Sequence, residues 1–366
     1  MQTVIVTDGK YRAAIAAVRT LGRAGYRVVV TQTRGDTKST PPSFASKYAA
    51  ETVWIEGGCD DAAYADRLAD AIRKYERPVL LCVGSKTLAA VSENRGRFDI
   101  LCDLLVAPTD VLDALNDKQT VHDRAAALGI PVPPEYDGTP TEYPVIVKPH
   151  CGEKFGLKAA QRYRVANDEE SYHAARKALA PYDASPIVQK KIDGQGVGVS
   201  MAVGANGELL AAICHRRIRE YPLTGGPSTC CESFYDEALV EKSYALLQSF
   251  GFMGVAMVEW KGEYLLEVNP RVWGSFPLTA CAGSPLIVRY AEAASGIAVD
   301  YAPDDYAHVK MRFFYNDLAA SLSLLLHGRR REGFAGLADM FRVKEAFADR
   351  DDPKPFRRYL VGSLRR

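Results

Sequence analysis

The sequence predicts a multidomain protein that combines an α/β region with an α+β region. Strand-like and helix-like runs alternate through the first third of the 366 residues, as in a parallel sheet covered by helices. The middle third instead carries apolar strands joined by tight turns such as Asn206-Gly207, which are typical of antiparallel hairpins. A chain of this length exceeds what one hydrophobic core usually supports, so we expect two or three domains.

The first third shows the alternation most clearly. The predicted elements are a strand at 3–7, a helix at 11–24, a strand at 26–31, a helix at 62–75 and a strand at 79–83. Gly25 follows the first helix at the position where a helix-ending glycine belongs. Ligands of parallel sheets bind at the carboxyl ends of the strands, so we expect Asp8, Gly9 and Ser85 to lie near a cleft. No G-x-G-x-x-G pattern follows the first strand, which argues against a dinucleotide site there.

Composition and charge exclude several classes of partner. The hydrophobic content of 47% and the charged content of 25% are typical of globular proteins, and the net charge of +1 argues against nucleic-acid binding through bulk electrostatics. The sequence has no run of 18 apolar residues and no signal-peptide pattern, so we expect no membrane insertion. The eight cysteines are scattered without a C-x-x-C pair, which indicates free thiols in a reducing compartment, the cytoplasm.

A second region begins near residue 110. Asp117-Lys118 opens a predicted helix, and the proline-rich segment 129–134 connects it to a buried strand at 144–149. This strand ends with Lys148 and runs into a loop punctuated by glycines at 152 and 156. Backbone N–H groups of such a loop, together with a lysine, suit a polyphosphate. The alternative is an ordinary solvated lysine at the end of a strand.

A basic stretch at 215–222 follows the hairpin around Asn206-Gly207, and a glycine turn with hydroxyl residues comes next. Cationic side chains beside a flexible turn suit the binding of a carboxylate or a phosphate. With Ser85 of the first sheet, the candidate substrate contacts are His215, Arg216, Arg219, Gly225, Gly226, Ser228 and Thr229. An exposed basic strand edge that discourages aggregation is the alternative, and a lone histidine such as His215 is more often structural than catalytic.

Two carboxylates and an amide stand close together near residue 260. Glu267 and Asn269 are two residues apart on an apolar strand, so they point to one face, and Glu259 ends the preceding strand. An all-oxygen set of this kind suits Mg²⁺, whereas solvated acids at a strand edge are the alternative. A two-residue turn at Lys261-Gly262 would put Glu259 and Glu267 on opposite faces. The metal site therefore requires a connection of three or five residues.

These segments, taken in order, resemble the ATP-grasp superfamily. The resemblance rests on Asp117-Lys118, Val147-Lys148-Pro149 with its glycine loop, Val188-Gln189-Lys190-Lys191-Ile192, Glu259, and Glu267-Val268-Asn269-Pro270-Arg271, and it covers about residues 1–300. The basic stretch and the run Asn269–Ser275 look like the branch of predicted ATP-dependent carboligases that includes D-aspartate ligase-like enzymes.

The resemblance implies ATP and Mg²⁺ as cofactors, with two ions expected and Mn²⁺ as a substitute. It implies that phosphates and base are contacted by Lys118 and Lys148, with a covering loop that includes Gly152, Glu153, Lys154 and Gly156. It implies an adenine-reading strand at Gln189, Lys190, Lys191 and Ile192, and metal ligands at Glu259, Glu267 and Asn269. Arg271, with Arg217 as second candidate, would stabilise the acyl phosphate and the tetrahedral intermediate.

The same resemblance implies an ATP-grasp fold with a Rossmann-like domain before it. The expected division is an N-terminal domain at 1–115, a small subdomain at 116–190, a large subdomain at 191–300 and a C-terminal extension at 301–366, with ATP between the two subdomains. One departure is Gly196, which stands where many members carry an acid for the ribose. Either another residue holds the ribose or the alignment shifts by one or two positions.

The expected activity is an ADP-forming carboxylate–amine ligase that acts on an amino acid or a related small acid through an acyl phosphate. Two alternatives stay open: a carboxylase or carbamoyl-transfer enzyme that works through carboxyphosphate, and a non-catalytic ATP-binding protein. The expected partners are a small carboxylate and an amine, and a homodimer stays open. We expect the basic clusters at 329–331 and 365–366 to be solvated surface.

Overall fold

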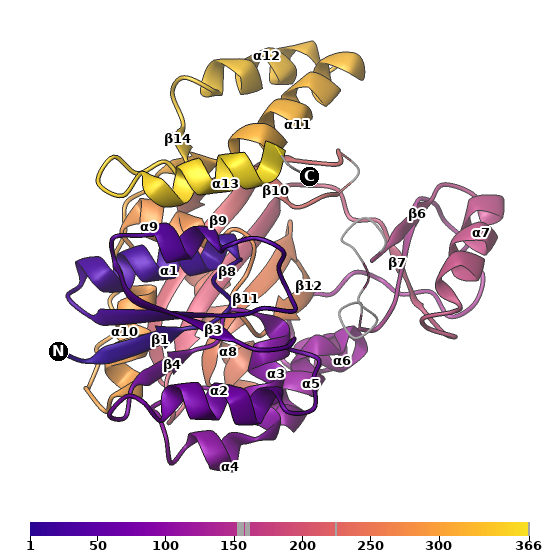
Figure 1. Cartoon of the computed structure of the whole chain (residues 1–366). Coiled ribbons are helices and arrows are strands. Elements are labelled where there is room, and N and C mark those ends of the chain that lie inside the picture. The colour runs from indigo at the N-terminus through magenta and orange to yellow at the C-terminus, as the bar shows by residue number, and fades with distance from the viewer. Residues whose placement is uncertain (152–156, 158–161, 224, 365–366) are drawn as a thin grey trace.

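The fold comes from a computed structural model that describes residues 1–151, 157, 162–223 and 225–364. Three sheets organise these residues: a four-stranded sheet, a three-stranded sheet and a seven-stranded sheet. Figure 1 shows the seven-stranded sheet in the middle of the molecule, with the first sheet and its helices on one side and the three-stranded sheet on the other. The mixed α/β class predicted from the sequence is confirmed.

The first sheet is parallel and has the strand order β3-β2-β1-β4, as the alternation of strands and helices predicted. Its elements and connections are β1 (Thr3–Val6), α1 (Arg12–Arg23), β2 (Arg27–Thr33), η1 (Pro42–Ala45), β3 (Ala49–Ile55), α2 (Tyr64–Ile72), β4 (Val79–Leu81), α3 (Ser85–Glu93) and α4 (Arg95–Phe98). Gly25 has a φ of 91° after the end of α1, so it is the helix-ending residue that the sequence indicated. β3 was not predicted, because its residues lie at half-buried and exposed positions, with only Ile55 buried, and form no continuous apolar run.

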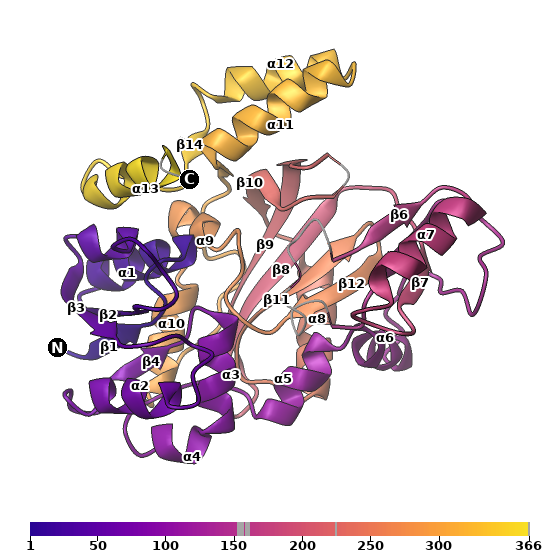
Figure 2. The ribbon, with the colours of Figure 1, turned by 45° about the vertical axis from the view of Figure 1, so that its right-hand side comes forward.

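Two helices, α5 (Thr109–Asn116) and α6 (Lys118–Ala127), lead to the second sheet. This sheet is antiparallel, with the order β6-β5-β7, and α7 covers it. Its elements are β5 (Val145–Lys148), β6 (Arg164–Ala166), α7 (Glu169–Leu179) and β7 (Ile187–Lys190). In Figures 1 and 2 it stands apart from the N-terminal sheet, across the open end of the large sheet.

The large sheet has the order β12-β11-β8-β9-β10-β13-β14. Its strands and helices are β8 (Gly196–Val203), β9 (Leu209–Glu220), β10 (Ser228–Phe234), α8 (Glu237–Ser249), β11 (Gly254–Lys261), β12 (Tyr264–Asn269), α9 (Pro277–Ala282), α10 (Leu286–Ala294), β13 (Lys310–Arg312) and β14 (Lys344–Glu345). Residues expected to form a separate C-terminal extension thus complete this sheet through β13 and β14.

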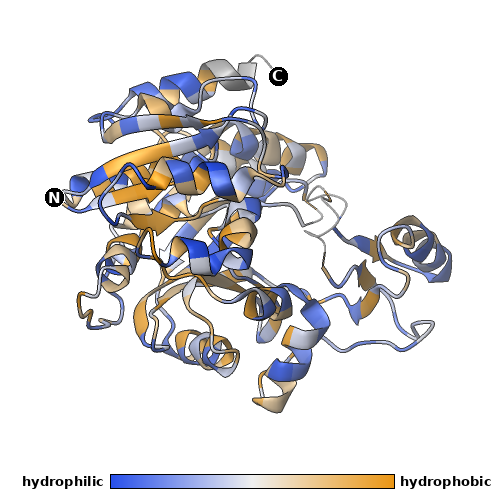
Figure 3. Cartoon of the chain, turned by 60° about the horizontal axis from the view of Figure 1, so that its bottom comes forward, coloured by the Kyte–Doolittle hydropathy of each residue, from blue (hydrophilic) through white to orange (hydrophobic). Residues whose placement is uncertain are grey.

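Both faces of the large sheet are buried. One core combines residues of the N-terminal sheet and α1, such as Val4 and Leu21, with Leu210, Val255 and Tyr290 of the large sheet and α10. The opposite face packs against α5, α6 and α8. Figure 3 shows the apolar residues concentrated in the strands, while the helices carry both polar and apolar positions. The N-terminal and large sheets are therefore held together by one continuous core, which fixes their relative position.

The last residues fold back onto the body. They form α11 (Phe314–Leu326), α12 (Arg330–Asp339) and α13 (Lys354–Leu364). The buried guanidinium of Arg19 in α1 donates to Asp352, with Nε 2.9 Å from Oδ2. At β9, Arg219 donates from Nε and Nη2 to the two carboxylate oxygens of Asp317 at 2.8 and 2.9 Å. The C-terminal segment is thus anchored to α1 of the N-terminal region and to β9 of the large sheet.

The Arg219–Asp317 pair gives a stability prediction. The Asp317 side chain is 0% exposed and that of Arg219 is 7% exposed. Asp317→Ala therefore leaves the buried guanidinium of Arg219 with Asp339 as its remaining carboxylate partner. We expect a loss of unfolding free energy of roughly 3–5 kcal/mol by urea denaturation. The control is Asp70→Ala in the exposed Arg73–Asp70 pair, which should cost less than about 1 kcal/mol. Equal losses in the two variants would contradict this role.

The structure also bears on the expectations about free thiols and membrane insertion. All eight cysteines lie within the described ranges and are free thiols. Burial raises the pKa of Cys59 and of Cys281 to about 11, so neither side chain is a thiolate at neutral pH. Within the part of the chain that the structure describes, no helix is long and apolar enough to cross a membrane.

Candidate active site

A cavity of about 650 Å³ lies where the small sheet, the large sheet and the C-terminal helices meet. The small sheet and α6 contribute side chains such as Lys118, Lys148 and Gln189, and the large sheet contributes Glu259 and Glu267. Further contributions come from α1, through Arg12, and from the α11–α12 pair, through Leu324, Arg329 and Glu332. Residues from all parts of the chain therefore form its walls, including two parts that the sequence did not associate with the site.

The two carboxylates predicted as metal ligands do lie on the same face. Glu259 of β11 is the direct cross-strand partner of Glu267 of β12. The turn between the strands is nevertheless a two-residue turn, because Lys261 pairs with Tyr264. The condition that the connection must have three or five residues was therefore wrong.

A β-bulge restores the alignment. The register advances from Trp260–Leu265 to Glu259–Glu267, so Leu266 is the extra residue opposite one position of β11. The carbonyl of Leu266 accepts hydrogen bonds from His122 Nε2 at 3.1 Å and from Lys148 Nζ at 3.5 Å. The bulge therefore sets the face of Glu267 and also ties the hairpin to α6 and β5.

Glu259 is held by Arg217 and by Asn269. The Nη2 atom of Arg217 donates to Glu259 Oε2 at 2.5 Å, and Asn269 Nδ2 donates to Glu259 Oε1 at 3.2 Å. Burial raises the pKa of Glu259 above its usual range; Arg217 opposes this shift and Glu267 adds to it. A cation between the carboxylates would relieve their repulsion, because it favours the charged form of both groups.

Glu267 lies among lysines. Its Oε2 atom is 3.2 Å from Lys118 Nζ. Burial by itself would raise the pKa of Glu267, but the ammonium groups of Lys118 and Lys148 outweigh burial and lower the pKa to about 2. Glu267 is therefore ionised at neutral pH, which is the form of a carboxylate that can bind a cation.

The donor set fits a hard divalent cation. Two facing carboxylates provide four oxygen atoms, and the amide of Asn269 lies between them, within 3.5 Å of each. Rotation of this amide by about 180° would bring its oxygen to the same point, since the two ends of an amide are nearly equal in shape. No cluster of three or more His, Cys, Asp or Glu residues that could hold a metal occurs among the described residues, so the candidate depends on this amide.

Lys148 is buried at the end of β5. Burial and the neighbouring charge of Lys118 lower its pKa to about 7. If Lys148 contacts a nucleotide phosphate, as expected from the sequence, the bound phosphate would favour the protonated form, and Lys148 would take up a proton on binding at a pH above about 7.

This property predicts a pH dependence of ATP binding. The free lysine is protonated below pH 7 and loses its proton above it, while the complex retains it, so affinity should fall as the pH rises from 7 to 9.5. We expect up to about tenfold weaker binding per pH unit, measured as the Kd of Mg-ATP. Lys148→Arg should show a flatter profile, because arginine stays charged over this range. A wild-type Kd that is constant over this range would contradict the assignment.

His122 and Glu135 form a polar network that the sequence did not reveal. Gln189 Nε2 lies 3.0 Å from His122 Nδ1 and 2.9 Å from Glu135 Oε1. Burial, followed by the charge of Lys148, lowers the pKa of His122, whose Nε2 lies 3.1 Å from the carbonyl of Leu266 and whose Nδ1 lies 2.9 Å from Glu135 Oε1. One signal in the sequence could have revealed His122. It lies four residues after Lys118, which places both side chains on one face of α6.

The expected adenine strand lies on the wall of the cavity. Gln189, Lys190, Lys191 and Ile192 all line it, but the side chain of Gln189 is engaged in the histidine network. The backbone N–H groups of Lys190 and Lys191 donate to Pro134 and Pro144. Within the described ranges the N–H of Ile192 has no such partner, so it is the donor best placed for a base edge.

The basic strand β9 divides its side chains between two faces. Arg217 and Arg219 line the cavity, whereas Arg216 points to the opposite face, where its Nε is 2.6 Å from Glu232 Oε1. Side chains of neighbouring residues in a strand point to opposite faces. Arg216 was expected to contact the substrate, but it does not line the cavity. Arg219 reaches the cavity, but its charge is committed to Asp317 and to Asp339.

His215 lies beneath the cavity. Its ring covers Gly198, where a Cβ atom would come within 2.2 Å of His215 Cε1. Its Nε2 atom is 3.1 Å from Ser275 Oγ, and burial together with Arg217 lowers its pKa to about 3. His215 is therefore a neutral residue that positions the loop at 273–275.

Some of the other residues expected to contact the substrate line the cavity, and others lie outside it. Gly225, Gly226 and Ser228 line the cavity, as does Gly196, whose absent Cβ leaves room for Arg217. Thr229 is buried and donates to Asp317, and Ser85 is exposed at the start of α3, so neither belongs to the cavity wall. Gly152, Glu153, Lys154 and Gly156 lie outside the described residues.

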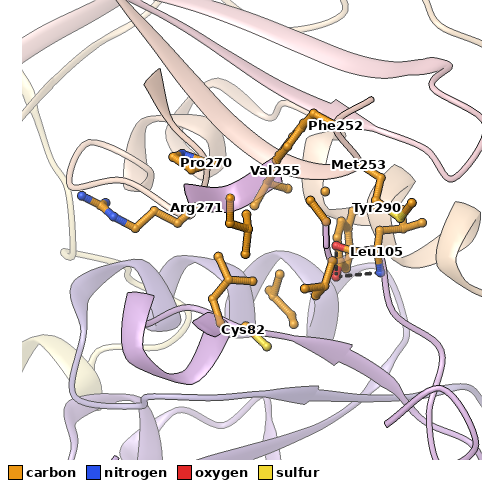
Figure 4. Close-up of a pocket in the computed structure, with 14 residues that line it drawn as sticks. Cys82, Leu105, Phe252, Met253, Val255, Pro270, Arg271 and Tyr290 are labelled. Carbon is orange, nitrogen blue, oxygen red and sulfur yellow. Dashed lines mark hydrogen bonds between the residues drawn. The ribbon is translucent and has the colours of Figure 1, made fainter. Parts of the chain in front are cut away.

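Arg271 contacts one of the candidate metal ligands, Asn269. Its Nη2 atom donates to Asn269 Oδ1 at 3.1 Å and its Nη1 atom to the carbonyl of Val272 at 3.0 Å. Figure 4 shows that the guanidinium points away from a second, apolar pocket lined by Cys82, Val255 and Tyr290. That pocket has about 10 Å³, which is at most the space of one water molecule, so it is a packing defect between two sheets.

Comparisons with known proteins show what the part of the chain that carries most of this site resembles. A family model described as an ATP-grasp domain matches residues 115–275. The structure is similar to the Campylobacter jejuni biotin carboxylase in its complex with a β,γ-ATP ligand (TM-score 0.61, 16% identity, 84% of this chain and 74% of that chain). It is also similar to the biotin carboxylase domain of Hydrogenobacter thermophilus 2-oxoglutarate carboxylase bound to MgADP (0.63, 14%, 84% and 73%). Rhizobium etli pyruvate carboxylase matches over 81% of this chain and 28% of that chain (0.60, 15%).

Proposed function

Because residues 115–275 form an ATP-grasp domain, we propose that this protein is an ADP-forming carboxylate–amine ligase that works through an acyl phosphate. The observation that supports this most strongly is the convergence of opposite charges on one cavity. Glu259, Glu267 and Asn269 lie beside Arg217, Arg271 and the two lysines Lys118 and Lys148. Such an arrangement can hold a polyphosphate with its cation and also neutralise a transferred phosphoryl group.

We propose ATP and Mg²⁺ as the cofactors. Glu259, Glu267 and Asn269 would hold Mg²⁺, with two ions in the complete site and Mn²⁺ as a substitute. The cation supplies neutralisation of the phosphate charge when bound. Entry of the cation and nucleotide would displace Arg217 from Glu259 and Lys118 from Glu267, so both cationic side chains become available to the phosphates.

In the proposed reaction a substrate carboxylate oxygen attacks the γ-phosphorus of ATP, and ADP leaves. The amine nitrogen then attacks the acyl carbon, phosphate leaves, and the nitrogen loses a proton. Arg271 and Arg217 would stabilise the charge on the transferred phosphoryl and on the tetrahedral intermediate. The proposal keeps the division into domains at 1–115, 116–190, 191–300 and 301–366. Residues of α1 and of the α11–α12 pair also border the site.

A screen for ADP release tests the function. The protein is incubated with Mg-ATP and pooled small carboxylic acids, with and without pooled amino acids as amines. Hydroxylamine is added in parallel, because it converts an acyl phosphate into a stable hydroxamate. We expect acid-dependent ADP release and a hydroxamate, with amide formation when the amine is present.

The control outcomes separate the alternatives. ADP release that depends on bicarbonate alone would replace the ligase by a carboxylase or carbamoyl-transfer enzyme. Nucleotide binding without ADP release under any condition would indicate a non-catalytic ATP-binding protein. Glu263→Gln, at the exposed turn of the same hairpin, serves as a matched control that should behave as the wild type.

A further inference from the structure

Arg12 brings a cation into the cavity from the side opposite the nucleotide wall. It is the first residue of α1 and lines the same cavity as Glu259 and Arg271. In both Figures 1 and 2, α1 lies on one side of the large sheet and β7, which carries Gln189 and Lys190, lies on the other. The helix that begins with Arg12 and the strand that carries Gln189 therefore border the cavity from opposite sides.

The guanidinium of Arg12 lies over an aromatic surface. It lies 4.2 Å from the centre of the Phe313 ring and 6.0 Å from that of Phe347. The two rings contact each other, with centres 5.7 Å apart. Stacking fixes the plane of a guanidinium while its N–H donors remain directed outward at the edge, which is the geometry that binds a carboxylate with two hydrogen bonds.

Arg12 also differs from the neighbouring arginines in its charge partners. Arg217 pairs with Glu259, Arg219 pairs with Asp317 and Asp339, and Arg329 pairs with Glu332. Among the residues that the structure describes, no carboxylate oxygen lies within 4.0 Å of the Arg12 guanidinium nitrogens. The nearby acid Glu345 instead accepts the backbone N–H of Phe314 at 2.7 Å.

We propose that Arg12 binds a substrate carboxylate that is not the one activated by phosphorylation. This carboxylate can belong to either of the two substrates. This proposal rests on the ligase function and names its substrate class: at least one substrate carries two carboxylates, as a dicarboxylic acid or an acidic amino acid does. The reacting carboxylate must lie beside the transferred phosphoryl, where Arg217 and Arg271 already face the metal ligands. A cation displaced toward α1 is placed for a group at the other end of the substrate.

Binding measurements with defined probes test the role of Arg12. The probes are succinate, aspartate and glutamate, in both enantiomers of the amino acids, and the corresponding monoamides. Each is titrated by calorimetry into the full-length protein with Mg²⁺ and a non-hydrolysable ATP analogue. We expect the wild type to bind at least one diacid roughly 10- to 100-fold more tightly than one of its monoamides, because one charge-assisted contact is lost.

Three variants complete the test. Arg12→Met keeps an unbranched apolar stem over Phe313 and should lose the preference for the diacid, with the Kd of the ATP analogue unchanged. Arg12→Lys should recover part of the preference. Arg124→Met removes another arginine that is stacked on a phenylalanine, Phe250, but lies outside the cavity wall, and it should keep the wild-type preference.

The outcomes distinguish this inference from the proposed function. A wild type that binds every diacid and its monoamides equally, or an Arg12→Met variant that retains the preference, overturns the role of Arg12. If the preference is present and depends on Arg12 but no acid stimulates ADP release, the ligase function fails and the carboxylate-binding role stands. Melting temperatures of the variants show whether a lost preference comes from unfolding.

Discussion

Glu267→Gln is expected to lower Mg-ATP turnover by roughly 10³-fold or more while the protein remains folded. The substitution preserves the volume of the side chain and removes one negative charge from the proposed metal site. Glu267 is partly exposed, so water replaces part of its ion pairing with Lys118 and Lys148, and the loss in stability should stay below roughly 3 kcal/mol. The measured quantities are the rate of ADP release and the melting temperature.

A metal-free binding measurement separates a ligand role from a general electrostatic role. Without Glu267 the site keeps Lys118 and Lys148 and becomes more positive, so ADP in the presence of EDTA should bind at least as tightly as to the wild type. The concentration of Mg²⁺ needed for half-maximal turnover should rise. Glu263→Gln, on the turn of the same hairpin, should change none of these quantities, and near wild-type turnover in Glu267→Gln would refute the metal assignment.

Arg271→Ala and Arg217→Ala are each expected to lower kcat by roughly 10²- to 10³-fold with little change in ATP affinity. Both guanidinium groups contact residues that we propose as metal ligands: Arg271 contacts Asn269 and Arg217 contacts Glu259. Their charge should count most when the phosphoryl group is in transfer, since we propose that the lysines and the cation carry the binding of ATP.

The measurement is kcat with a known substrate pair and the Kd of Mg-ATP. Arg216→Ala is the matched control for Arg217, because it removes the same side chain from the adjacent position on the opposite face of β9. It should retain kcat. An Arg271 or Arg217 variant that loses ATP binding while kcat is preserved would assign that arginine to the nucleotide site.

Much of the fold could be predicted because it depends on local patterns. The alternation of strands and helices indicated the parallel N-terminal sheet, and Asn206-Gly207 indicated the β8–β9 hairpin. The pairing of β13 and β14 with the large sheet could not be read in the same way. These strands are two or three residues long, and their place depends on contacts between segments far apart in the chain.

The candidate site shows the same limit. The sequence indicated Glu259, Glu267 and Asn269 as one set, but the turn length alone would have separated the two acids. The bulge at Leu266 aligns them, and its carbonyl is held by His122 and Lys148 from other elements. A bulge of this kind is stabilised by tertiary hydrogen bonds, so the spacing of residues in the hairpin does not reveal it.

The sequence by itself determined the class of fold and the types of residue that can bind a polyphosphate with its cation, because period-two and helical patterns and charged motifs are local properties of the chain. The tertiary structure decided which of the basic residues face the cavity. Strand alternation turns Arg216 away, burial makes His215 a positioning residue, and Asp317 engages the charge of Arg219. It also brought Arg12 and the α11–α12 pair to the cavity. Arg12 packs on Phe313 and Phe347, more than 300 residues later in sequence, and α11 is held by the Arg219–Asp317 pair, 98 residues apart.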